Sequence, residues 1–207
     1  MRPHTTVRGV RVYLYEHEAV CSAILAAEDF YEAAILDDLA KRYPTHATIV
    51  DVGAHIGNHT IYWSAFVPHD AIYAFEPVPT NYALLLANTA DKPGVRTIRA
   101  ALSDHDGVER MELDPVNMGR CRIDRDGPLP VAVMRLDDLD LVGVTLIKVD
   151  VEGHQAEVLA GARSTILRGR PVLLVEDGEG TAEDALAGLD YRLEASYPGS
   201  NDLWVPM

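Results

Sequence analysis

The chain has 207 residues, of which 48% are hydrophobic, so it can bury a core of ordinary size and global disorder is excluded. Its formal net charge of -14 makes nucleic acid a poor partner, because an acidic surface repels phosphate backbones. The N-terminal stretch lacks the apolar core of a signal peptide, and no stretch is long and apolar enough to span a bilayer, so we expect a cytoplasmic protein without membrane insertion.

Cys21 and Cys121 stand far apart and are expected to be buried thiols, because neither a disulfide framework nor a zinc motif has this spacing. We expect one domain over residues 1–207. Residues 1–45 form an N-terminal strand and helix cap, and residues 104–130 form a loop or hairpin excursion.

The N-terminal cap begins with the alternating stretch VRGVRVYLY at 7–15, which predicts a strand or hairpin arm. Residues 16–43 have a helical pattern with a break near Glu28 and Asp29, and Pro44 ends it.

The middle of the chain alternates strands and helices. Short apolar runs predict buried strands at 47–53, 71–77 and 95–103, and helical patterns lie between them at 58–66 and 79–90. After the excursion, strands are expected at 144–150 and 171–177, with helices at 155–167 and 181–189. Residues 191–197 and 202–207 predict a closing antiparallel pair. This order predicts an α/β fold with a three-layer, doubly wound and mostly parallel sheet.

In such sheets a ligand lies beyond the carboxyl ends of the strands, so the residues that end each strand are the first site candidates. The first strand ends at Asp51, followed by Gly53 and Ala54. Glycine allows close approach of a ligand to the backbone, although a tight turn into a helix would use the same residues.

The second strand ends at Glu76, about one β-α-β unit after Asp51, where an acid can accept two hydrogen bonds from a ribose diol. A helix-capping acid is the weaker alternative. A dinucleotide motif would require glycine where His55 stands, and Asp51 would repel a pyrophosphate. A cationic adenosine ligand such as S-adenosylmethionine therefore fits better.

The remaining strand ends also carry polar groups. Ser103 and Asp104 could bind an adenine amino group or simply form a turn. The stretch IKVDVEGH carries three ionisable groups at and beyond the end of its buried strand, which are costly to bury unless paired or used, and another acid ends the strand at 171–177. These residues are Asp150, Glu152, His154 and Glu176.

Together these residues resemble the FkbM family of S-adenosylmethionine-dependent methyltransferases. The matching pieces occur in family order over roughly residues 28–180: DVGAHIGNHT at 51–60, AFEPVPTNYALLLAN at 74–88, ALSDHDG at 101–107, RLDDL at 135–139, LIKVDVEGHQAEVLAGA at 146–162 and VLLVE at 172–176.

The resemblance implies a class I, Rossmann-like methyltransferase fold and methylation of a hydroxyl on a small molecule, sugar or natural product. It also implies a cofactor site made by a loop at the methionine end, a ribose acid, neighbours of the adenine and the FYE segment at 30–32. The corresponding residues are Asp51, Gly53, Ala54, Gly57, Asn58, Glu76, Ser103, Asp104 and Glu32.

For catalysis, His154 is the first candidate base because its usual pKa lies near neutrality, and Glu152 would orient it or act as the base itself, beside Asp150. Oxygen ligands from Asp150, Glu152 and Glu176 could hold a magnesium-like ion, so metal dependence stays open. The excursion also carries three cations that could meet an anionic substrate, although pairing with nearby acids is the safer expectation: Arg120, Arg122 and Arg125.

Two rival functions remain: an NAD-dependent oxidoreductase, and a cofactor-binding but catalytically silent member that acts through a partner. The expected partner is a small-molecule hydroxyl acceptor. Exposed edge strands would also allow a homo-oligomer.

Overall fold

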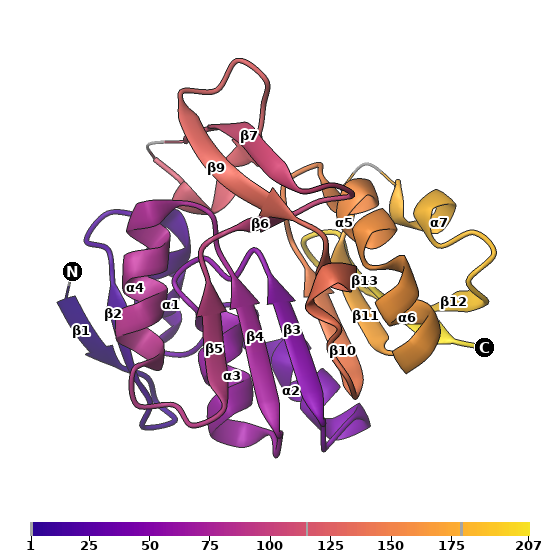
Figure 1. Ribbon diagram of the computed structural model, residues 1–207. Coiled ribbons are helices and arrows are strands. Elements are labelled where there is room, and N and C mark those ends of the chain that lie inside the picture. The colour runs from indigo at the N-terminus through magenta and orange to yellow at the C-terminus, as the bar shows by residue number, and fades with distance from the viewer. Residues whose placement is uncertain (1, 115, 179) are drawn as a thin grey trace.

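The structure is a computed structural model that describes residues 2–114, 116–178 and 180–207. Its central sheet has the strand order β12-β13-β11-β10-β3-β4-β5 (Figure 1). The strands are β3 (Thr48–Val52), β4 (Ala71–Phe75), β5 (Val95–Ile98), β10 (Val144–Val149), β11 (Val172–Glu176), β12 (Tyr191–Tyr197) and β13 (Asn201–Pro206). The stretch from β11 to β5 is parallel, and β13 and β12 are antiparallel additions.

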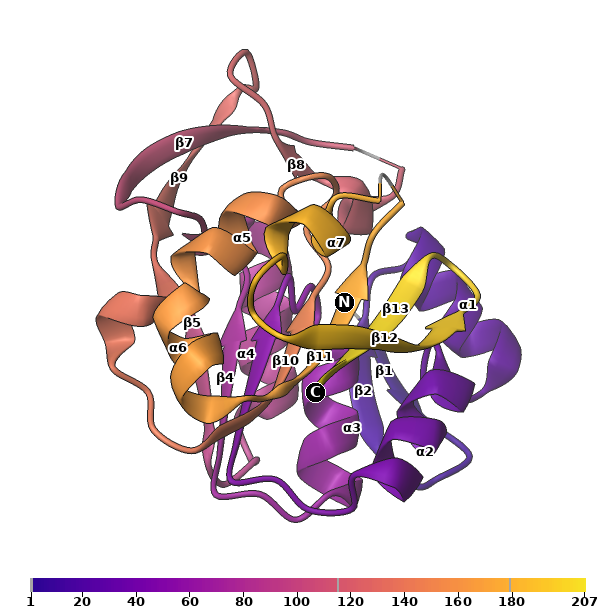
Figure 2. The same cartoon turned by 90° about the vertical axis from the view of Figure 1, so that its right-hand side faces the viewer.

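Helices cover both faces of this sheet, as the alternation of neighbouring strand residues requires. Ile49 of β3 joins a core with α2 and α3, whereas Val50 joins a second core with α5 and α6. Figure 2 shows these helix pairs on opposite sides of the sheet. The helices are α1 (Ala19–Ala27), α2 (Ala33–Arg42), α3 (Asn58–Phe66), α4 (Pro79–Thr89), α5 (Gln155–Gly161), α6 (Arg163–Gly169) and α7 (Ala182–Ala185).

The predicted three-layer, doubly wound sheet with a closing antiparallel hairpin is therefore confirmed. The chain builds outward from β3 to β5, then returns through β10 on the other side of β3. The strand order thus reverses between β3 and β10, which is where open α/β sheets form a crevice.

The third predicted strand is wrong as a single element. β5 is the edge strand of the central sheet, pairs only with β4 and ends at Ile98, where the chain leaves this sheet. Residues Ala101–Leu102 form a separate strand, β6, that pairs with β9 of a second sheet. Ser103 and Asp104 consequently do not end a strand of the central sheet.

The second sheet has the order β6-β9-β7-β8 and stands above the carboxyl ends of the central strands (Figure 1). It contains β7 (Gly107–Glu112), β8 (Arg122–Ile123) and β9 (Leu129–Met134), with the 3₁₀ helices η1 (Met118–Arg120) and η2 (Leu136–Leu139) beside them. Its small core of Val78, Met111, Cys121 and Val131 joins it to the turn after β4. Most of the 104–130 excursion therefore covers the carboxyl ends of the central strands.

The N-terminal region forms a ribbon of β1 (Arg2–Thr5) and β2 (Arg11–Leu14), followed by α1 and α2. The predicted break between these helices is confirmed: Glu28 and Glu32 both have left-handed backbones, at φ 55° and 57°. The helix predicted for 155–167 is also divided, at Ala162. Of the helices in the described ranges, none is long and apolar enough to cross a membrane.

Candidate active site

One cavity lies beyond the carboxyl ends of β3, β4, β10 and β11, between the central sheet and the second sheet. Its wall carries five carboxyl groups, namely Glu32, Glu76, Asp150, Glu152 and Glu176. Its opposite, largely apolar side includes Met111, Met118, Cys121 and Ile123 from the excursion. The cavity is therefore an acidic site with an apolar roof, and its position follows from the strand order.

The turn after β3 is tight because backbone and side chains fill the space beside its glycines. A Cβ on Gly53 would lie 1.8 Å from the carbonyl oxygen of Asp150, and Gly53 has φ 75°. A Cβ on Gly57 would lie 2.8 Å from Leu85 Cδ1. Gly53 thus allows the turn after β3 to approach the end of β10, and Gly57 allows close packing of the same turn against α4. Gly53 and Ala54 line the cavity, whereas Gly57 does not.

Glu76 follows β4 and is 4% exposed at the cavity wall. Its Oε2 accepts the His55 N–H at 2.9 Å, and its Oε1 accepts the Val78 N–H at 2.8 Å and the more distant Asn81 amide at 3.4 Å. Burial raises the pKa of Glu76 to about 7, even though these donors oppose the shift. The carboxyl group is therefore rigidly placed and retains lone pairs for a ligand diol.

Asp51 does not line the cavity. It is fully buried on β3, where Thr60 donates to its Oδ2 at 2.5 Å and Lys148 Nζ lies 3.5 Å from its Oδ1. Lys148 comes from the facing position on β10 and also bonds the Gly53 carbonyl at 2.9 Å and Asp150 Oδ2 at 3.1 Å. Asp51 thus acts on the site through a buried lysine.

Asp150, Glu152 and Glu176 offer oxygen atoms that all lie within 4.8 Å of one another. Burial would raise the pKa of Asp150, but the Lys148 ammonium and a hydrogen bond with Glu176 together outweigh it, and the pKa falls to about 2. Burial, a hydrogen bond with Asp150 and the charge of Asp150 raise the pKa of Glu176 to about 9. At neutral pH and without a cation, Asp150 is ionised and Glu176 carries a proton.

Glu152 lies half-buried beside this pair and has a left-handed backbone at φ 50°. Burial and the charge of Asp150 raise its pKa, whereas the charge of Arg120 lowers it. Left-handed non-glycine residues at a cavity mark a backbone held by its surroundings, and His55 and Glu32 share this conformation at the same cavity.

His154 lines the cavity, but its Nε2 lies 3.0 Å from the hydroxyl of Ser103, and its Nδ1 is 3.6 Å from Glu157. Burial lowers the pKa of His154, so the ring is neutral at pH 7. Ser103 is fully buried, and Asp104 is exposed and pairs with His105. Of His154, Ser103 and Asp104, only His154 lines the cavity.

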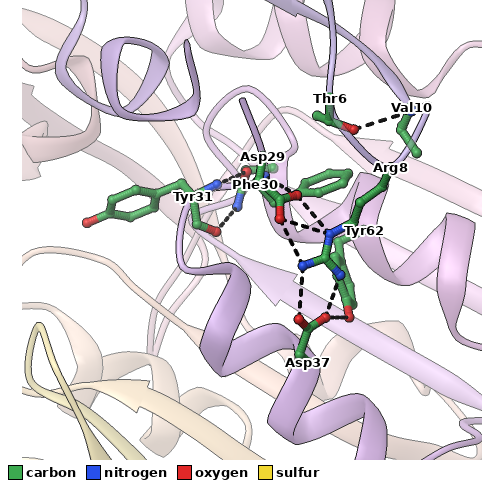
Figure 3. A network of polar contacts seen from close by, with 9 residues as sticks. Thr6, Arg8, Val10, Asp29, Phe30, Tyr31, Asp37 and Tyr62 are labelled. Atoms are coloured by element: carbon green, nitrogen blue, oxygen red, sulfur yellow. Dashed lines mark hydrogen bonds and ion pairs between the residues drawn. The ribbon is translucent and has the colours of Figure 1, made fainter. Parts of the chain in front are cut away.

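The segment 29–32 is fastened over the cavity by contacts from several elements. Figure 3 shows the Arg8 guanidinium between Asp29 and Asp37, at 2.8 Å and 2.6 Å from their oxygens. Asn58, the first residue of α3, accepts the Tyr31 N–H at 3.0 Å and donates to the Tyr31 carbonyl at 3.0 Å.

Glu32 ends this segment and connects it to two other parts of the molecule. Its Oε1 accepts the Asn201 amide of β13 at 3.0 Å, and its Oε2 lies 3.3 Å from His59 Nε2. The predicted cofactor residues Glu32 and Asn58 are therefore brought together at one side of the cavity.

Sequence reasoning missed Lys148 and Asn81. Lys148 left a signal, because it is the one charged residue inside the apolar run VTLIKV, where only a paired charge is tolerated. Asn81 bonds both Glu76 and the Met118 carbonyl of η1, but an asparagine in a helix carries no comparable signal.

The fold and the position of the acids define a Rossmann-like fold of the class I methyltransferase type. The chain belongs to the family described as the methyltransferase FkbM domain, whose model matches residues 51–194. The matched region begins at Asp51 and includes β10, β11 and the second sheet.

Curated relatives of this chain are methyltransferases by name. It is 31% identical over 122 residues to the hexuronic acid methyltransferase AglP of Haloferax volcanii, and these aligned residues cover 56% of this chain and 50% of AglP. It is 27% identical to the 2-O-methyltransferase NoeI of Sinorhizobium fredii, over 59% of this chain and 60% of NoeI. The chain thus spans about half the length of AglP.

Solved structures support the fold. A methyltransferase FkbM from Methylobacillus flagellatus matches with a TM-score of 0.59 at 20% identity, over 78% of this chain and 44% of that one. A precorrin-6y C5,15-methyltransferase from Geobacter metallireducens matches with a TM-score of 0.51 at 17% identity, over 78% and 71% of the two chains.

Proposed function

We propose that this chain transfers a methyl group from S-adenosylmethionine to a hydroxyl oxygen of a small molecule or sugar. The observation that carries the proposal is the acidic cavity at the strand-order reversal, with Glu76 in place for a ribose diol. Relatives whose names specify a hexuronic acid and a 2-O position support a sugar hydroxyl as acceptor.

The cavity suits a cationic adenosine ligand better than a dinucleotide. A pyrophosphate would face five carboxyl groups, and Lys148 already contacts two carboxylates and a carbonyl. His55 Nε2 is buried without a hydrogen-bond partner among the described residues, and His55 lines the same wall. A ligand with polar edges would satisfy such an atom. An NAD-dependent oxidoreductase is therefore not favoured.

In this proposal Glu76 and the turn from Gly53 to Asn58 bind the cofactor, while Glu32 holds the covering segment closed. Bound S-adenosylmethionine supplies an electrophilic methyl group. The acceptor oxygen bonds to the methyl carbon as the carbon–sulfur bond breaks, and a protein base takes the hydroxyl proton. The apolar side chains opposite the acids lower the local polarity, which strengthens the interactions of these charges.

Glu152 is the base that the geometry favours. His154 is already in contact with Ser103, and Asp150 has a pKa too low for a strong base. Glu152 lines the cavity, and burial raises its pKa above the usual value of a glutamate, which makes it a stronger base than Asp150. The oxygen donors of Asp150, Glu152 and Glu176 would also suit a magnesium-like ion, which would displace the proton of Glu176.

The proposal is tested by incubating the protein with methyl-labelled S-adenosylmethionine and a panel of glycosides, with magnesium or with a chelator. Label should appear in an ether of one acceptor hydroxyl, and Glu152→Gln should reduce transfer by about 10²-fold or more while cofactor binding stays unchanged. Cofactor binding without transfer to any member of the panel would favour the catalytically silent alternative. Loss of transfer with the chelator, restored by magnesium, would assign the carboxyl cluster to a metal.

A further inference from the structure

The cavity wall carries a positive charge at Arg120. Arg120 ends η1 and lines the cavity, and within the described ranges it has no ion pair with any carboxylate. Nearby Arg122, in contrast, lies 3.9 Å from Asp124. Lys148, the second cation of the wall, is engaged by Asp51 and Asp150.

The position of Arg120 is fixed by its neighbours. Asn81 donates to the Met118 carbonyl at 3.2 Å, and the Asn117 side chain accepts the Gly119 N–H at 3.1 Å. The Asp114 carboxylate accepts the N–H groups of Val116, at 2.9 Å, and of Asn117, at 2.8 Å. The backbone that presents Arg120 is therefore ordered by side chains of the same excursion and of α4.

Arg120, Glu152 and Tyr31 line the same cavity. The charge of Arg120 acts on Glu152 and on Tyr31, lowering the pKa of both against the larger effect of burial. A group bound to Arg120 would consequently lie near the proposed base.

Tyr31 provides a second surface in this cavity. Its backbone is held at both polar groups by Asn58, and its ring points away from the Arg8 contacts in Figure 3. Tyr31 lines the cavity and is 39% exposed. An accessible aromatic ring fixed by its backbone suits the apolar face of a sugar ring, with a polar tip for its hydroxyl groups.

We propose that the acceptor carries a carboxylate, that Arg120 binds this carboxylate, and that the Tyr31 ring packs against the acceptor. This inference rests on the proposed function. A guanidinium binds a carboxylate through two parallel hydrogen bonds and so fixes the orientation of the acceptor as well as its affinity. The ionised Asp150 would otherwise repel an anion from this cavity, so a cation of the wall that has no ion pair among the described residues favours acceptors that carry a carboxylate.

The test compares methyl glucuronide and methyl galacturonide with the matching neutral glycosides, by calorimetry on protein saturated with S-adenosylhomocysteine and by methyl transfer. At least one uronide should bind tenfold or more tightly than its neutral counterpart. Arg120→Gln should abolish that preference, and Tyr31→Ala should weaken binding of the same uronide. The control Arg125→Gln changes an exposed arginine of the same excursion that does not line the cavity, and it should retain the preference.

Two results would overturn this inference. In one, neither uronide is preferred by the wild type. In the other, Arg120→Gln weakens S-adenosylhomocysteine binding by tenfold or more, which would place Arg120 on the cofactor carboxylate. Failure of the wild type to bind S-adenosylhomocysteine at all would instead refute the proposed function, so the two failures are distinguishable.

Discussion

Lys148, the buried lysine of β10 that faces Asp51 of β3, gives the strongest stability prediction. In Lys148→Met the side-chain volume is nearly kept, but three contacts are lost, at 2.9 Å to the Gly53 carbonyl, 3.1 Å to Asp150 and 3.5 Å to Asp51. Asp51 is fully buried, and its Oδ1 has no hydrogen bond of its own within the described chain. The variant therefore leaves an uncompensated charge inside the sheet.

Removing one partner of a buried ion pair costs about 3–5 kcal/mol. For a domain of this size that corresponds to a fall in Tm of roughly 6–20 °C, at about 2–4 °C per kcal/mol. Urea unfolding at pH 7 would measure the free energy of unfolding directly. The double variant Lys148→Met with Asp51→Asn should lose less stability than the sum of its single variants, because the unpaired charge is then absent.

Lys41→Met is the control, since Lys41 is an exposed lysine of α2 and its loss should cost less than about 0.5 kcal/mol. A cost below about 1 kcal/mol for Lys148→Met, or a strictly additive double variant, would refute the reasoning that Lys148 compensates Asp51.

Two further predictions concern the covering segment and the carboxyl pair. Arg8→Met should lower the free energy of unfolding by about 1–3 kcal/mol and weaken cofactor binding, because Arg8 bonds both Asp29 and Asp37 through partly exposed groups. Arg42→Met, which loses an exposed ion pair with Asp38, should leave both the stability and cofactor binding nearly unchanged. In the cation-free protein the raised pKa of Glu176 means that the folded state holds a proton which the unfolded state releases near its usual pKa of 4.5. Stability should therefore fall as the pH rises from about 4.5 towards about 9, and Glu176→Gln should flatten that part of the unfolding curve; an unchanged slope would contradict the assignment of the proton.

Much of the fold could be predicted because buried parallel strands are continuous apolar runs with clear helix patterns between them. The runs at 47–53, 71–77 and 144–150 correspond to β3, β4 and β10. The run at 95–103 was misassigned because β5 and β6 are joined by only two residues, and apolarity does not reveal which sheet a strand joins.

The site was predictable in its acids but not in the direction that each side chain takes. A strand end specifies that a carboxylate lies near the crevice, and Glu76, Asp150, Glu152 and Glu176 do line it. Whether an acid faces the cavity or the interior of the sheet depends on its partner on the neighbouring strand. Asp51 contacts Lys148 inside the sheet and does not line the cavity. The contact between His154 Nε2 and the Ser103 hydroxyl likewise depends on the position of β6, which precedes Ser103. The sequence did not predict that β6 belongs to the second sheet.

Calorimetric titration with S-adenosylmethionine and S-adenosylhomocysteine, on wild type, Glu76→Ala and Glu109→Ala, tests the central claim most directly. Glu109 is a carboxylate of β7 outside the cavity wall and serves as the control. We predict micromolar binding by the wild type and by Glu109→Ala, and at least a tenfold loss in Glu76→Ala, because each hydrogen bond to a charged group contributes about 1.5–3 kcal/mol. Absence of binding to both ligands, or equal affinity in Glu76→Ala, would contradict the account.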